Sequence, residues 1–246
     1  MSGRVIAVAS GKGGVGKTWF AITLAQALAG AGRRVLLLDA DLGLANADVQ
    51  LGLAPRVDLG AVLAGRVAAE AAVMPHPAGF ELLPGQSGSG ALAGLEGGAL
   101  DALLDLPRRL AASRDVVVDL GAGLGAAQRR LLAAADLPLV IATEEPTSLT
   151  DAYAVLKLLA ADAPGRDARL VVNLASSTAA GARTHATLDA ATRRFLGRGL
   201  ALAGVVRRDA KVPDAIRHQA PLLTRHPGSA AGADVAAIAR GLSAGH

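Results

Sequence analysis

A glycine-rich segment near the beginning of the chain has the residue types and the spacing that bind phosphate. Residues 11–18 read G-K-G-G-V-G-K-T and match G-x-x-x-x-G-K-[ST], between an apolar run at 5–9 and a helical stretch. Glycines let consecutive backbone N–H groups surround phosphate oxygens, and the positive end of the next helix faces the same oxygens. We expect Lys17 to reach the β- and γ-phosphates and Thr18 to hold Mg²⁺; the alternative is an ordinary glycine turn. The expected nucleotide-binding residues are Gly11, Lys12, Gly13, Gly14, Val15, Gly16, Lys17 and Thr18.

This segment, called the phosphate loop below, contains one lysine more than phosphate binding requires. Lys17 already supplies the cation, so Lys12 is free to make a second phosphate contact. The chain holds 25 lysines and arginines together, and its lysines are Lys12, Lys17, Lys157 and Lys211. Half of the lysines therefore lie in the phosphate loop, although a solvated surface lysine is the alternative interpretation of Lys12.

Acidic residues follow two further apolar runs. Asp39 and Asp41 lie at alternate positions at the end of the run 35–39, and Asp119 ends the run 115–119 before a glycine-rich segment that starts at Gly121. A hard cation takes oxygen ligands, and phosphoryl transfer needs a positioned water, so these carboxylates suit an Mg²⁺ site and a catalytic base. A turn with helix-capping aspartates explains one acid of the first pair but not both. Gly121 would donate its N–H to the γ-phosphate.

The elements that position these residues alternate between strand-length apolar runs and longer helical patterns. This alternation predicts an α/β protein with a doubly wound, mostly parallel, seven-stranded sheet and helices on both faces, the architecture of a P-loop NTPase. Ligands of such sheets bind beyond the carboxyl ends of the strands, where the residues above fall. We expect strands near 4–9, 35–39, 80–83, 115–119, 138–142, 169–173 and 203–206, and helices near 17–31, 58–72, 97–112, 125–134, 148–161, 183–196, 211–218 and 230–242.

Composition limits the remaining possibilities. A chain of 246 residues with 52% hydrophobic content is expected to form one domain, residues 1–246. The absence of cysteine excludes thiolate metal sites and fits a reducing cytoplasm. No apolar stretch reaches a membrane span of ~20 residues, and the first strand begins too early for a signal peptide. The net charge of +4 comes from arginines in the last third, either a solvated surface or a face for nucleic acid or anionic membrane.

The phosphate loop resembles the deviant Walker A family, KGGxxGK[ST], which includes MinD, ParA, the nitrogenase iron protein and the Mrp carriers. The resemblance implies an ATPase in which Lys12 crosses a homodimer interface to the partner's nucleotide, so that ATP stabilises the dimer. It also implies that Asp39 supports Mg²⁺ and that Asp41 positions the hydrolytic water. The iron-sulfur branches are excluded because they use cysteines.

The same resemblance implies residues at the base and ribose. Asn173 ends a strand where the family places an asparagine that pairs with adenine, although it could be an ordinary strand-end residue. Glu145 is expected to reach the partner's ribose. Asp209 lies in the segment 207–212, which matches the adenine-side loop of the family except for an arginine where proline is common.

Within this family the chain most resembles the flagellar branch known as FlhG, FleN or YlxH. The stretches that carry the likeness are 39–53, 82–90, 116–123, 145–157 and 216–239. The branch regulates flagellar number and placement with a signal-recognition-type GTPase, FlhF, and with basal-body or transcriptional partners. Only three residues precede the first strand where many members carry an activator segment, so stimulation of that GTPase is not expected.

The last expected helix has Val235, Ile238 and Leu242 on one face and a single cation, Arg240. This pattern favours packing against the domain over the basic amphipathic helix that grips anionic lipid. Recruitment to the cell pole or the inner membrane face would then be weak or need a partner.

Three functions remain. The first is an ATP-switched flagellar regulator with slow hydrolysis, and the second is a ParA-like partitioning ATPase that binds nonspecific DNA through its arginines. The third, a biosynthetic amide ligase or dethiobiotin-type synthase, would not need Lys12.

Overall fold

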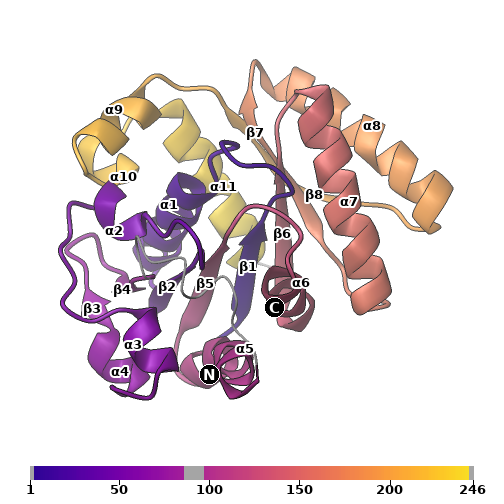
Figure 1. Cartoon of the computed structure of the whole chain (residues 1–246). Helices are drawn as coiled ribbons and strands as arrows, with labels where there is room; N and C mark the ends of the chain where they lie inside the picture. The colour runs from indigo at the N-terminus through magenta and orange to yellow at the C-terminus, as the bar shows by residue number, and fades with distance from the viewer. Residues whose placement is uncertain (1–2, 86–96, 244–246) are drawn as a thin grey trace.

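The computed structural model describes residues 3–85 and 97–243. The last five residues of the predicted family stretch 82–90 lie outside the described part. The helices and strands are arranged in three layers, a sheet between two sets of helices (Figure 1).

The central sheet of the described residues has the order β3-β4-β2-β5-β1-β6-β7-β8, and every neighbouring pair is parallel except β3 and β4. Apolar runs buried on both faces of the sheet form its central strands, as expected for parallel sheets. The strands are β1 (Val5–Ala9), β2 (Val35–Ala40), β3 (Met74–Pro75), β4 (Glu81–Leu83), β5 (Asp115–Leu120), β6 (Leu137–Ala142), β7 (Arg169–Ala175) and β8 (Ala201–Arg207).

The predicted α/β class and its mostly parallel sheet are confirmed, but the count of seven strands is corrected to eight. The additional strand, β3, has two residues, one of them a proline, and pairs antiparallel with β4 at the sheet edge. Two residues are too few to show a periodic pattern in the sequence.

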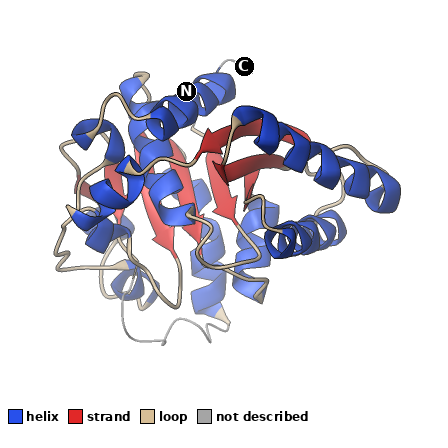
Figure 2. Cartoon of the chain, turned by 90° about the horizontal axis from the view of Figure 1, so that it is seen from above, coloured by secondary structure: helices blue, strands red, loops and turns tan. Residues whose placement is uncertain are grey.

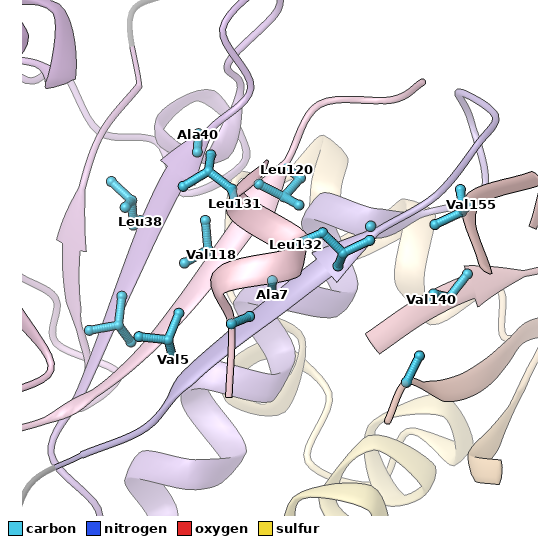
Figure 3. Packing of buried hydrophobic residues seen from close by; sticks show 14 of the residues in the cluster. Val5, Ala7, Leu38, Ala40, Val118, Leu120, Leu131, Leu132, Val140 and Val155 are labelled. Atoms are coloured by element: carbon cyan, nitrogen blue, oxygen red, sulfur yellow. The ribbon is translucent and has the colours of Figure 1, made fainter. Parts of the chain in front are cut away.

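Helices cover both faces of the sheet, which lies between two helical layers in Figure 2. Alternate side chains of each strand enter two hydrophobic clusters, one on either face. Figure 3 shows the cluster in which Val5 and Ala7 of β1 pack beside Leu131 and Leu132. That face carries α3 (Leu59–Leu63), α4 (Ala69–Ala72), α5 (Gly98–Leu110), α6 (Ala126–Ala134), α7 (Pro146–Asp162) and α8 (Thr178–Leu196); the other carries α1 (Lys17–Gly30), α2 (Ala47–Gln50), α9 (Lys211–Arg217), α10 (Leu222–Arg225) and α11 (Ala230–Ser243).

Most predicted helices are present, with three local differences. The expected helix 58–72 is two short helices, α3 and α4, separated by a turn in which Gly65 has φ +68°. Helix α8 begins five residues before the predicted start because the Ser177 hydroxyl caps it, accepting from the Ala180 N–H at 3.1 Å. The four-residue helices α2 and α10 were not predicted.

The last helix packs against the domain, as the sequence predicted. Val235, Ile238 and Leu242 are buried against α1 and β8. A Cβ on Gly204 of β8 would lie 2.5 Å from the Ile238 side chain, so glycine lets helix and strand approach closely. In residues 3–85 and 97–243, no helix is both long and apolar enough to cross a membrane.

Candidate functional site

The phosphate loop joins the end of β1 to the start of α1 at the carboxyl edge of the sheet. Its backbone needs glycine at two positions, Gly14 with φ +76° and Gly16 with φ +85°. A third glycine, Gly11, is enforced by space, because a Cβ there would lie 2.5 Å from the carbonyl oxygen of Asp151. No side chain of the described residues caps α1, so its first N–H groups are open to an anion. Lys17, the first residue of α1, is buried beneath the loop.

Asp39 and Asp119 face each other on neighbouring strands. They are direct register partners of β2 and β5, and both are 1% exposed. Burial is the largest cause of both raised pKa values: together with the nearby charge of Asp41 it raises the pKa of Asp39 to about 6, and together with the charge of Asp39 it raises that of Asp119 to about 8. The Thr18 hydroxyl and the Lys17 ammonium both lie close enough to Asp119 to lower its pKa.

This pair fits a divalent cation. Two buried carboxylates beside a threonine hydroxyl form an oxygen-rich site of the kind that Mg²⁺ takes. The Oδ1 atom of Asp119 is buried without a hydrogen-bond partner among the described residues. A cation near this oxygen would satisfy it and offset the repulsion between the two acids. Thr18, Asp39 and Asp119 thus lie together, although their metal roles stay a prediction.

Asp41 and Gly121 meet beside this pair. The Asp41 Oδ1 accepts hydrogen bonds from the N–H groups of Gly43 at 3.1 Å and Leu44 at 3.0 Å. A Cβ on Gly121 would lie 2.9 Å from the same oxygen, so glycine keeps this approach open. The candidate base and the candidate γ-phosphate donor therefore belong to one constellation, as the strand-end positions suggested.

Lys12 is paired within its own chain. Its Nζ donates to Glu145 Oε2 at 2.8 Å and to Thr147 Oγ1 at 3.1 Å, at the start of α7. The Lys12 ammonium holds the pKa of Glu145 below its usual range. The two side chains are 39% and 65% exposed, so water competes for both partners. The sequence did not predict that these two candidate residues would pair, or that Thr147 would bind Lys12 as well. The one sequence feature that could have indicated Thr147 is its position two residues after Glu145.

The base-side candidates lie near the ends of β7 and β8, but β7 continues two residues beyond Asn173, where the sequence predicted its end, to Ala175. Asn173 is fully buried, and its Nδ2 donates to the Val15 carbonyl at 2.8 Å. Its Oδ1 is buried and has no partner within the described residues, which leaves one acceptor for an exocyclic amine. Asp209 accepts from the Lys211 N–H at 2.9 Å and from the Ser229 hydroxyl at 2.7 Å, so it ties its loop to the beginning of α11.

Trp19 was not predicted as a site residue, but it lies beside the phosphate loop. A Cβ on Gly16 would lie 2.4 Å from Trp19 Nε1 and 2.6 Å from Asn173 Nδ2. The indole and the amide therefore flank the same glycine. Because Trp19 directly follows the loop, its position was visible in the sequence, but its packing against Asn173 depends on the folded sheet.

An uncapped helix behind a glycine-rich loop, beside buried strand-end acids on a parallel sheet, defines a P-loop nucleotide-binding protein. Residues 6–222 match the family described as the CobQ/CobB/MinD/ParA nucleotide binding domain. The chain belongs to this family.

Individual relatives cover most of the chain. It is 40% identical to antiactivator FleN of Pseudomonas aeruginosa over 96% of this chain and 85% of that protein. It is 38% identical to the flagellum site-determining protein YlxH of Helicobacter pylori over 63% of this chain and 53% of that protein. Among solved structures, MinD of Pyrococcus horikoshii with Mg-ADP superposes with a TM-score of 0.82 at 23% identity, covering 98% of this chain and 96% of that one.

Stability should depend on pH through the acidic pair. Asp39 and Asp119 have raised pKa values in the folded state. Their contribution to the free energy of unfolding is therefore fully present below the usual pKa of 3.8, and it is lost as pH rises through about 6 for Asp39 and about 8 for Asp119. We expect the melting temperature of the nucleotide-free protein, relative to that of Asp119→Asn, to fall between pH 5.5 and 8.5. Thermal melting of both proteins at pH 5.5 and pH 8.5 measures this difference. An equal change of melting temperature in the two proteins would contradict the raised pKa of Asp119.

The buried amide should contribute to nucleotide affinity and to base choice. Asn173→Leu removes the bond to Val15 and the free acceptor with little change of volume, so ADP affinity should fall on the order of tenfold. Wild type should prefer ADP to GDP, because guanine presents an acceptor to Oδ1, and the variant should lose that preference. Isothermal titration with both nucleotides tests this, and an unchanged ADP/GDP ratio would assign Asn173 to the fold alone.

Proposed function

We propose that this chain is an Mg²⁺-dependent ATPase that dimerises with ATP and regulates flagellar number or placement. The observation that carries the proposal is the constellation of the phosphate loop, its extra lysine and the buried acidic pair. The 40% identity to an antiactivator named FleN over nearly the whole chain supports the flagellar role. Family members are P-loop ATPases, and slow hydrolysis is part of this proposal.

Within one subunit, the residues bind and orient the triphosphate. The loop backbone and Lys17 surround the phosphates, and Thr18, Asp39 and Asp119 would hold Mg²⁺, which supplies charge neutralisation when bound. Asp41 orients the attacking water and takes its proton. Gly121 reports the γ-phosphate through its N–H, next to Asp41.

The dimer would form across the face that carries the phosphate loop. Leu44 follows β2 and is 75% exposed, and Leu124 follows the neighbouring strand β5 and is 38% exposed. A second subunit that covered this face would bury both leucines. Lys12 would leave Glu145 and offset phosphate charge in the second subunit, and Glu145 would then be released to approach the partner's ribose.

The DNA-binding alternative loses support from the ion pairs of the last third. Arg207 binds Asp234 through two nitrogens at 2.8 Å, Arg225 binds Asp214 at 2.6 Å, and Arg193 binds its helical neighbour Asp189 at 2.8 Å. Arginines neutralised in their own chain release fewer counterions on binding a phosphate backbone. A steep, ATP-dependent loss of DNA binding with rising salt would restore this alternative.

The proposed partners and location follow the flagellar relatives. We place the protein in the cytoplasm, with an FlhF-type GTPase or a flagellar basal-body or transcriptional protein as partner. A solved MinC:MinD complex from Aquifex aeolicus, with a TM-score of 0.79 and 26% identity to this chain, shows that a protein of this fold takes a partner. Recruitment to the pole or inner membrane face would come through such a partner.

We also propose that residues 1–246 form a single domain.

Separating hydrolysis from dimerisation tests the ATP switch. Asp41→Ala should bind ATP, hydrolyse it at least roughly a hundredfold more slowly and remain dimeric, because the carboxylate that positions the water is lost while the phosphate loop and Lys12 are kept. Phosphate release and light scattering after size exclusion measure the two properties. A variant that hydrolyses at the wild-type rate would contradict the role of Asp41.

Lys12→Ala should bind ATP with near wild-type affinity and stay monomeric, since the lost ammonium acts on the other subunit. Lys157→Ala, an exposed lysine on α7, is the matched control and should dimerise normally. Dimers of Lys12→Ala with a non-hydrolysable ATP analogue would overturn the proposal.

A further inference from the structure

A strained residue outside the nucleotide site is connected to it by a continuous path. Gln219, between α9 and α10, has φ +52°, and within the described residues Leu174 is the other non-glycine residue with positive φ. For a residue with a side chain this conformation is strained. Such strain is retained when the conformation places a side chain where it is needed.

The Gln219 side chain reaches α2, 170 positions away in sequence. Its Nε2 donates to the Val49 carbonyl at 3.0 Å, and this carbonyl also accepts from the Gly52 N–H at 3.2 Å. Gly52 has φ +66°, and a Cβ there would lie 3.2 Å from the Cβ of Gln219, so the two segments touch. Gln219 thereby fixes the end of α2 that lies away from the acidic pair.

The other end of α2 is bound to Asp39. The Asp39 Oδ2 accepts from the N–H groups of Asn46 at 3.0 Å and Ala47 at 2.9 Å. Within the helix, Gln50 Nε2 donates to Asn46 Oδ1 at 2.9 Å and braces the single turn. A one-turn helix held in this way moves as a unit, so a shift at Val49 reaches the Asp39 carboxylate.

We propose that Gln219 is a positioning residue of the nucleotide site, which acts through α2 on the orientation of Asp39. This inference rests on the proposed function, because it assigns Asp39 to the support of Mg²⁺. Loss of the Gln219 contact would weaken the part of nucleotide binding that depends on Mg²⁺. It would leave the part made by the loop backbone and Lys17 unchanged.

Alternative roles for Gln219 make different predictions. If Gln219 served only the stability of the fold, nucleotide affinity would change equally with and without Mg²⁺. Trp19 offers an independent readout, because it lines a small apolar cavity with Gln50 of α2 and with Ile216 and Ala220 on either side of Gln219. A change in the position of α2 should therefore alter the fluorescence of the single tryptophan.

The test compares ADP binding by the full chain in Mg²⁺ and in EDTA, measured by isothermal titration. Gln219→Gly removes the side chain and relieves the positive φ, so it does not weaken the fold through strain. Gln219→Glu keeps the length and the strain but replaces the donor with an acceptor that faces the Val49 carbonyl. His218→Ala is the matched control, since the side-chain bonds of His218 to other described residues go to Asp214 of α9.

We expect both Gln219 variants to bind Mg-ADP roughly fivefold more weakly, as expected for one lost hydrogen bond, with no change in EDTA. The change in Trp19 fluorescence on adding Mg²⁺ to the ADP complex should shrink in both, and the control should match wild type. Unaltered Mg-ADP affinity in both variants, or an equal loss in EDTA, overturns this inference alone. A wild-type protein that binds no ADP in either buffer overturns the proposed function as well.

Discussion

Two carboxyl groups enclosed on adjacent strands are the constraint on which the site depends. Asp39 and Asp119 are held in register by β2 and β5, and both are buried away from water. Burial is the main cause of both raised pKa values, and folding must accept its cost because the parallel sheet fixes the two backbones. A buried acidic pair of this kind is costly without a cation, and it lies beside the loop that binds phosphate. The cost of ionising both acids thus falls where a metal–nucleotide complex can offset it.

Asp39 also shows how the binding of a cation can affect residues at the protein surface. Its oxygens accept backbone N–H groups of residues 41, 46 and 47, so the carboxylate organises the loop after β2 as well as the metal site. A carboxylate that turns toward a cation weakens some of these bonds. Helix α2 is the element that would respond first, since it begins at this oxygen and is one turn long.

The sequence could predict what depends on local pattern. The phosphate loop, the strand-end acids and the central strands follow from residue type and period, and the loop and the acids were found at the carboxyl edge of the sheet. The edge strand β3 and the helices α2 and α10 could not be predicted, because two to four residues carry no period and tertiary contacts form them. The contacts of Lys12 with Glu145 and of Gln219 with Val49 cross more than a hundred residues and use exposed side chains, for which no sequence pattern exists.

The partner of Lys12 bears on how the proposed switch could operate. A lysine buried against a carboxylate would pay a large desolvation cost to leave it, and exchange between chains would be slow. Lys12 and Glu145 are instead both accessible to water, so separating the two side chains costs little free energy and neither charge is shielded from solvent. An exposed pair at the start of α7 therefore keeps the ammonium extended beside the phosphate loop while leaving it available to a second triphosphate. Charge then decides which group Lys12 binds. Without nucleotide, Lys12 binds the single carboxylate of Glu145. When ATP is bound, the several negative charges of the triphosphate compete with that carboxylate for the ammonium.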